Sequence, residues 1–237
     1  MPCKRVEDGV FSTAEFKKFV ESVVPFLHIT TRIEDHPNDD LLYDFDENSF
    51  PAFLIIDADG GLLARHRESA TLKEFQRTLA KVKARGELAK KAAAGDKAAA
   101  IDLALLDCEL NAIDHADLEE QLEGKVLSDA QKKKFKGLAA DEEVAEMIQL
   151  IQANKHRAAM LGDAGEAFAE LLKGGGIPLG RRTGFYFWLG IGTYAWDLKK
   201  SELLERSLKE LVPLAEGDRF FTYLRKELIK RRDGADK

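Results

Sequence analysis

The sequence predicts an α/β module over residues 1–85 followed by an all-helical module over residues 86–237. Two observations divide the chain in this way. Up to residue 85, short apolar runs typical of strands alternate with segments whose apolar residues have helical spacing. From residue 86 onwards no strand-like alternation remains, and alanine and lysine, both good helix formers, become frequent.

The composition is that of a globular protein, with 45% hydrophobic and 33% charged residues. A net charge of −6 and a pI of about 5.5 disfavour a general nucleic-acid binder. The longest apolar stretch, residues 185–196, is shorter than the roughly 20 residues that span a bilayer. No apolar segment typical of a secretory signal follows Met1. The sequence therefore predicts no nucleic-acid partner and no membrane span, and it does not indicate a compartment.

No metal or cofactor site is predicted. The five histidines lie far apart, without the spacing of zinc ligands, and the two cysteines, Cys3 and Cys108, do not form a disulfide framework. The glycine-rich stretch 174–183 has the glycine spacing of a phosphate-binding loop. Arg181 and Arg182 replace its lysine and a helix precedes it, which favours a plain loop.

The first helix is expected to begin near residue 12. Ser12 and Glu15 have the spacing of a capping box, and Phe11 and Phe16 that of a hydrophobic staple. Pro25 should end this helix.

A strand at residues 27–33 and a short helix at 39–45 are expected next. Ala52–Ile56 is a continuous apolar run, which predicts a strand buried on both faces and opened by Pro51. Asp57–Gly61 has the residues of a turn between antiparallel strands.

A helix that starts at a capping box, Thr71–Glu74, and ends at Gly86 completes the α/β module. In the second module Ser128 and Gln131 form another capping box. The helices expected there cover residues 87–94, 97–111, 115–123, 129–137, 141–160, 164–173, 183–197, 201–214 and 218–232.

The first module resembles a thioredoxin-like domain read from its active-site helix onwards. The order of elements agrees, Pro2-Cys3-Lys4 matches the end of the family's Cys-x-x-Cys-Lys motif, and Pro51 matches its cis-proline. The resemblance implies thiol–disulfide exchange on a protein or peptide substrate. Cys3 would be the resolving cysteine, and Pro51 would shape the substrate face.

The chain departs from this pattern at its start. The family's first cysteine would fall one position before Met1, and the strand before the motif is missing. We therefore expect the natural protein to be longer, with Met1 internal to a Cys-Met-Pro-Cys motif. The alternative is a short domain whose remaining strands pair directly.

Three functions remain open for the first module: impaired dithiol exchange, a non-catalytic interaction scaffold, and a single-thiol redox sensor. Amide groups at a helix start favour a thiolate, which is the form that attacks a disulfide. Without a function, Cys3 would be an ordinary terminal residue. Cys108 is expected to lie on a helix of the second module as a core residue, and not to be a partner of Cys3.

The second module resembles a tetratricopeptide-type repeat array. Residues 161–167 resemble its inter-helix turn, although no 34-residue period runs through the module, and an irregular bundle is the alternative. The aromatic stretch 185–196 predicts core packing, with Gly190 and Gly192 admitting a close neighbouring helix. The alternative for this stretch is a peptide groove edged by Arg181 and Arg182.

Overall fold

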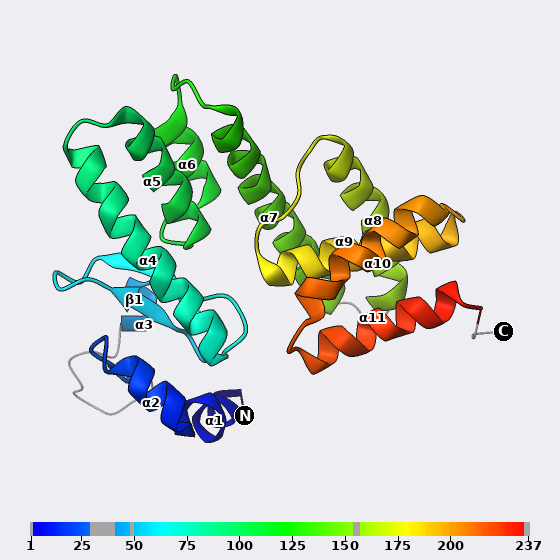
Figure 1. Cartoon of the computed structure of the whole chain (residues 1–237), viewed down its shortest axis with the longest axis horizontal. Coiled ribbons are helices and arrows are strands. Elements are labelled where there is room, and N and C mark those ends of the chain that lie inside the picture. The colour runs from blue at the N-terminus through cyan, green and yellow to red at the C-terminus, as the bar shows by residue number, and fades with distance from the viewer. Residues whose placement is uncertain (1, 29–40, 48–49, 154–156, 235–237) are drawn as a thin grey trace. The chain divides into compact units, whose positions relative to one another are not determined.

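The computed structural model describes residues 2–28, 41–47, 50–153 and 157–234. Over these residues the protein is mostly helical, with one hairpin of two short strands. The chain divides into two compact units, Met1–Leu122 and Glu123–Lys237. Figure 1 gives the element labels.

The first unit holds seven helical segments and the hairpin among its described residues. They are α1 (Pro2–Asp8), the 3₁₀ helix η1 (Val10–Ser12), α2 (Ala14–Val20), α3 (Leu41–Asp44), β1 (Leu54–Ile56), β2 (Leu62–Arg65), α4 (Leu72–Ala93), α5 (Lys97–Glu109) and α6 (His115–Leu122). The second unit is entirely helical over its described residues. It comprises α7 (Asp129–Ala153), α8 (Arg157–Lys173), α9 (Arg181–Asp197), α10 (Ser201–Ala215) and α11 (Arg219–Arg232).

The hairpin confirms the predicted turn. Strands β1 and β2 pair antiparallel. The Asp57 carboxylate accepts hydrogen bonds from the amides of Asp59, at 3.0 Å, and Gly61, at 2.7 Å. Gly60 has a φ of 87°, a left-handed conformation that glycine adopts without strain. The turn therefore forms from its own local hydrogen bonds.

The prediction of a strand buried on both faces is wrong, because β1 is a short strand of a two-stranded sheet in the described structure. Ile56 is 45% exposed. Of the strand expected at residues 27–33, residues 27 and 28 are not in a strand and the rest lie outside the described residues. The helix expected at 39–45 is found as α3 (Leu41–Asp44).

The start of α2 is one residue later than predicted. Thr13, not Ser12, is the N-cap, and its hydroxyl accepts a hydrogen bond from the Phe16 amide at 3.2 Å. Ser12 belongs to η1, where its hydroxyl donates to the carbonyls of Asp8 and Gly9. The predicted contact between Phe11 and Phe16 is confirmed, with ring centroids 4.6 Å apart.

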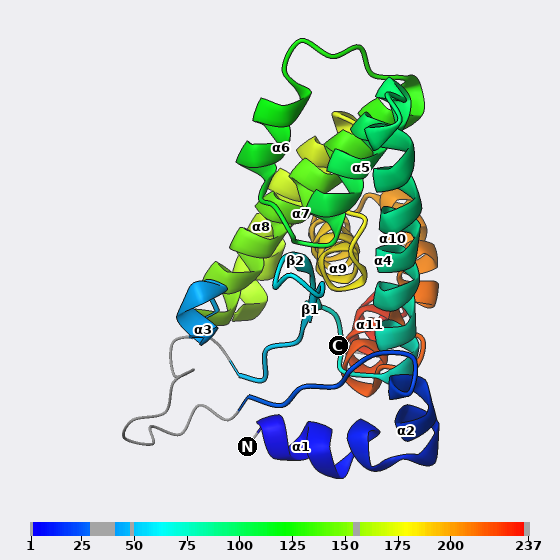
Figure 2. The same ribbon diagram turned by 90° about the vertical axis from the view of Figure 1, so that its left-hand side faces the viewer.

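Helix α4 begins as predicted, with the Thr71 hydroxyl accepting from the Glu74 amide. It continues through Gly86, so the predicted helix end there is wrong and the proposed boundary at residues 85/86 falls inside a helix. Helices α4 and α5 lie side by side (Figure 2). Arg85 binds the Asp107 carboxylate between them, and this pairing fixes the C-terminal half of α4 to the first unit.

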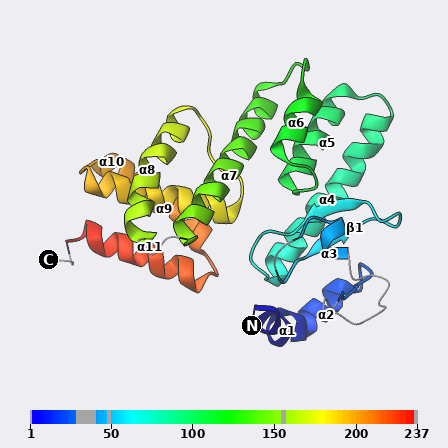
Figure 3. The ribbon, with the colours of Figure 1, turned by 180° about the vertical axis from the view of Figure 1, so that it is seen from behind.

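Helix α9 is the centre of the second unit, packed between α8 and α10 (Figure 3). The prediction that its aromatic stretch packs in the core is confirmed. Phe221 from α11 stacks on Phe185 with ring centroids 3.9 Å apart. The buried residues of α9 in this core are Phe185, Phe187, Trp188, Leu189, Ile191 and Ala195.

Close approach between α8 and α9 depends on glycine, as expected for Gly190. A Cβ added at Gly190 would lie 2.8 Å from the Phe168 ring. One added at Gly165 would overlap the Gly190 carbonyl oxygen. The predicted inter-helix turn at 161–167 is wrong, since these residues lie inside α8. Gly165 therefore serves helix packing rather than a chain reversal.

The glycine-rich stretch before α9 is a capped loop. The Asp141 carboxylate of α7 accepts hydrogen bonds from the Leu179 and Gly180 amides and from the Thr183 hydroxyl.

The predicted capping box of α7 is confirmed, because the Ser128 amide donates to the Gln131 side chain and the Gln131 amide donates to the Ser128 hydroxyl. Within the described part of the chain, no helix has the length and apolar character needed to cross a membrane.

Candidate thiol site

The candidate site begins with Cys3, which lies in the first turn of α1. It is exposed, and its thiol is free. Lys4 pairs with Asp8 one helical turn later, with Nζ 3.6 Å from a carboxylate oxygen. Because both of these side chains are largely exposed, the pair contributes little to the stability of the helix.

Pro51 lies three residues before β1, and the Phe50–Pro51 peptide bond is cis, as the resemblance implied. The proline ring is half-buried, whereas the preceding Phe50 is 51% exposed. Phe53 follows and accepts a hydrogen bond through its carbonyl from the His66 amide, at 2.9 Å. Pro51 is thus held at the entrance of the hairpin.

An aromatic cluster joins the N-terminal helices to the hairpin and α4. The Phe11 ring, from η1, contacts Phe53 edge-on at 5.9 Å. Phe16, from α2, contacts Phe75 of α4 at 5.7 Å, and Phe53 contacts Phe75 at 5.2 Å. Helix α1 contacts η1, which follows it directly in the chain, so the helix that bears Cys3 is connected through η1 to the cluster next to Pro51, and both belong to the first unit.

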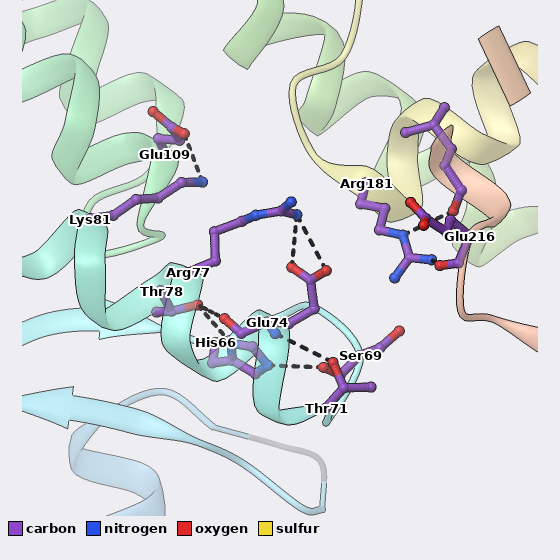
Figure 4. Close-up of polar contacts among 11 residues, drawn as sticks. His66, Ser69, Thr71, Glu74, Arg77, Thr78, Lys81, Glu109, Arg181 and Glu216 are labelled. Atoms are coloured by element: carbon purple, nitrogen blue, oxygen red, sulfur yellow. Dashed lines mark hydrogen bonds and ion pairs between the residues drawn. The ribbon is translucent and has the colours of Figure 1, made fainter. Parts of the chain in front are cut away.

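His66, which directly follows β2, also belongs to this cluster. Its ring stacks on Phe75, with centroids 4.4 Å apart. One ring nitrogen, Nε2, lies 3.3 Å from the Ser69 carbonyl oxygen, and Nδ1 lies 2.8 Å from the Thr78 hydroxyl (Figure 4). If Nε2–H donates to Ser69, Nδ1 is left to accept from the Thr78 hydroxyl, whose single proton also lies 3.1 Å from its other acceptor, the Glu74 carbonyl oxygen.

Burial lowers the pKa of His66, against the opposing effects of the Ser69 carbonyl and the Glu74 carboxylate. Glu74 is itself buried and accepts two hydrogen bonds from Arg77, at 3.2 and 3.0 Å (Figure 4). Burial of the ring thus favours the neutral imidazole in the folded first unit.

We expect the first unit to lose stability as the pH falls below about 6.5, the ordinary histidine pKa. The unfolded chain binds a proton at His66 in this range, whereas the folded unit, with its lowered pKa, does not. The stability of the first unit continues to fall until the pH reaches the pKa of His66 in the folded state. His66 contributes at most about 1.4 kcal/mol per pH unit to this fall. Amide exchange of β2 and α4 between pH 7.5 and about 5 measures it.

The matched control for this prediction is His66→Gln, which has no proton to gain in this range. Its first unit should show a flatter pH dependence than the parent protein. Equal slopes in the two proteins would show that another group carries the effect.

Cys108 is separate from the candidate site. It lies on α5 and is half-buried and free of any disulfide, whereas it was predicted to be a core residue. Asp107, next to it, binds Arg85, and burial raises the pKa of Asp107 in spite of this partner.

The sequence did not indicate three buried polar residues of the first unit. They are Glu47, His66 and Glu74. His66 lies between an apolar strand and a capping box, which could have suggested its burial, but no residue near Glu47 in the sequence indicates that Glu47 is buried.

Among the described residues, no group of His, Cys, Asp and Glu could hold a metal ion. Compared with protein-family models, curated proteins and solved structures, the chain matches none of them.

Proposed function

We propose that this chain takes part in thiol–disulfide exchange through Cys3, with the helical second unit engaging a protein partner. The observation that supports this most is that an exposed free thiol, at Cys3, belongs to the module that also presents Pro51. In the first unit the hairpin is followed by α4, which is the order expected for the later half of a thioredoxin-like domain, and then by α5 and α6.

The exchange step uses only the thiolate of Cys3 and a disulfide of the partner. The Cys3 sulfur attacks one sulfur of that disulfide, the partner's S–S bond breaks, and the other sulfur leaves as a thiolate. The product is a mixed disulfide between Cys3 and the partner. Release of that partner needs a second thiol, for which Cys108, half-buried on α5, is not suited.

The first test is the reaction of the full chain with glutathione disulfide at neutral pH, followed by intact mass. A Cys108→Ser variant should gain one glutathione, and a Cys3→Ser variant should gain none at a comparable rate. The matched control for the local sequence is a synthetic peptide of residues 1–8, which has the same thiol without the fold. Modification at Cys108, or a folded chain no faster than the peptide, would contradict the proposal.

A second test measures complete turnover by insulin reduction. The chain itself should show little activity, because a single thiol cannot finish a dithiol cycle. A cysteine placed directly before Met1 should restore activity if Cys3 can then take the resolving role that the thioredoxin-like resemblance implies. No restoration in a folded variant would favour the second candidate below.

The second candidate is a non-catalytic scaffold. It is favoured by one observation, the described sheet of only two strands, which departs from the larger sheet of the family it resembles. A scaffold would keep its partner binding when Cys3 is replaced by serine, whereas an exchange protein would lose covalent capture of a disulfide partner.

A further inference from the structure

Helix α11 has one surface that the core does not use. Phe221 and Leu228 face inwards, where Phe221 stacks on Phe185 and Leu228 packs at Gly192. Residues on the opposite side of a helix follow at spacings of three and four. We call this outer surface the α11 face, defined by Arg219, Phe220, Tyr223, Lys226 and Lys230, all of them exposed.

The α11 face combines positive charge with exposed aromatic rings. Phe220 is 55% exposed and Tyr223 is 57% exposed, so neither ring is needed to fill the core. Arg219 and Lys226 lie one turn to either side of Tyr223 on the same side of the helix. Aromatic rings exposed among cations are typical of a binding surface rather than of a solvated helix.

The charge of α11 is opposite to that of the whole chain. Its sequence, RFFTYLRKELIKRR, contains six cationic residues and one anionic residue, Glu227, whereas the chain carries a net charge of −6. Lys230 pairs with Glu227 at 2.7 Å, and Arg232 pairs with Glu205 at 3.2 Å. The positive charge is therefore local to one helix and partly balanced at its C-terminal end.

We propose that the α11 face binds an acidic amphipathic segment of a protein partner. Arg219 to Lys230 spans about 16 Å along the helix axis, which is the length of about three helical turns of a partner segment. Carboxylates on that segment would pair with the cations, and its apolar side chains would cover the rings of Phe220 and Tyr223.

An acidic protein segment fits better than a nucleic acid or a membrane. Nucleic acid binding needs several phosphates neutralised at once, and a net charge of −6 repels a polyanion at long range. A membrane-surface helix needs a broad exposed apolar side, but the apolar side of α11 is buried in the core. The inference rests on the partner-recruiting role proposed for the second unit and not on the chemistry of Cys3.

The test is fluorescence anisotropy with the full chain and a short fluorescein-labelled amphipathic peptide whose polar side carries only glutamate. Lys226→Glu should weaken binding about tenfold, and Tyr223→Ala should weaken it about fivefold. Both side chains are exposed, so the variants should keep the parent's thermal melt. Higher ionic strength should weaken binding to the parent.

The matched control is Lys133→Glu, which makes the same change in net charge at an exposed position of α7. It should bind the peptide as the parent does, and so should Cys3→Ser, which separates this inference from thiol exchange. No peptide binding, or equal weakening by Lys226→Glu and Lys133→Glu, would overturn the proposal. Tighter binding to a single-stranded oligonucleotide or to anionic vesicles than to the peptide would also overturn it.

Discussion

Replacing Gly165 by alanine should destabilise the second unit by about 2 kcal/mol. The added methyl group would overlap the carbonyl oxygen of Gly190 and lie 2.6 Å from the Cβ of Tyr194. These obstacles are close to the backbone of α9, so the two helices must separate, and overpacking of this kind typically costs about 1–3 kcal/mol or more. The gain in helix propensity, about 1 kcal/mol, does not offset it.

The control for Gly165→Ala lies on the same helix. A Cβ added at Gly162 would meet its nearest atoms, from Asp197 and Thr193, at 3.5 and 3.8 Å, which is ordinary contact. Gly162→Ala should therefore stabilise the unit by about 0.5–1 kcal/mol. The two tryptophans, Trp188 and Trp196, both lie in α9, so the change in tryptophan fluorescence during urea unfolding reports the second unit. Equal effects of the two substitutions would contradict the close packing of α8 on α9.

Replacing Glu47 by glutamine should destabilise the first unit by about 2 kcal/mol. The Glu47 side chain is 1% exposed and accepts two hydrogen bonds from Arg67, at 2.8 and 2.9 Å. Arg65 lies 3.4 Å away and is itself only 19% exposed. Loss of the carboxylate leaves the Arg65 charge without its partner in a poorly solvated position, and breaking a buried pair on one side costs about 3–5 kcal/mol. We expect a smaller destabilisation for Glu47→Gln, because Arg67 is half exposed and water can solvate its charge.

The same substitution at Glu87 is the control. Glu87 pairs with Lys90 at 2.8 Å, but both side chains are largely exposed, and such pairs contribute about 0.5 kcal/mol or less. Far-UV circular dichroism follows both units, so the transition not accompanied by tryptophan fluorescence reports the first unit. If Glu47→Gln lowers the stability of the first unit as little as Glu87→Gln does, the buried ion pair does not stabilise this unit as predicted.

The features predicted best from the sequence are those that form within a few residues. The turn at Asp57–Gly61 and the caps at Thr71 and Ser128 depend on hydrogen bonds between near neighbours. The last two helices, expected at residues 201–214 and 218–232, occur as α10 and α11. Local signals of this kind need no knowledge of the tertiary structure.

Two errors come from glycines that lie inside helices. Gly86 was expected to end a helix and Gly162 to belong to a turn, but both lie inside helices. Other errors come from residues whose role depends on distant partners. The helix expected at 129–137 continues through Gly137 to Ala153. Gly137 faces Leu179, forty-odd residues away, and a Cβ added there would lie 2.8 Å from that side chain. Burial of Glu47 depends in the same way on Arg65 and Arg67 of a later strand and loop. For the candidate site, the sequence indicated Cys3 and Pro51 but not the cluster of Phe11, Phe53, Phe75 and His66 that links their segments.

The most direct test of thiol exchange at this site is nuclear magnetic resonance of the chain with glutathione attached to Cys3. If Cys3 and Pro51 form one substrate face, the amide signals of Ala52 and Phe53 should shift on attachment and return when the disulfide is reduced. Shifts confined to α1, with Ala52 and Phe53 unchanged, would contradict the proposal that the two residues act together.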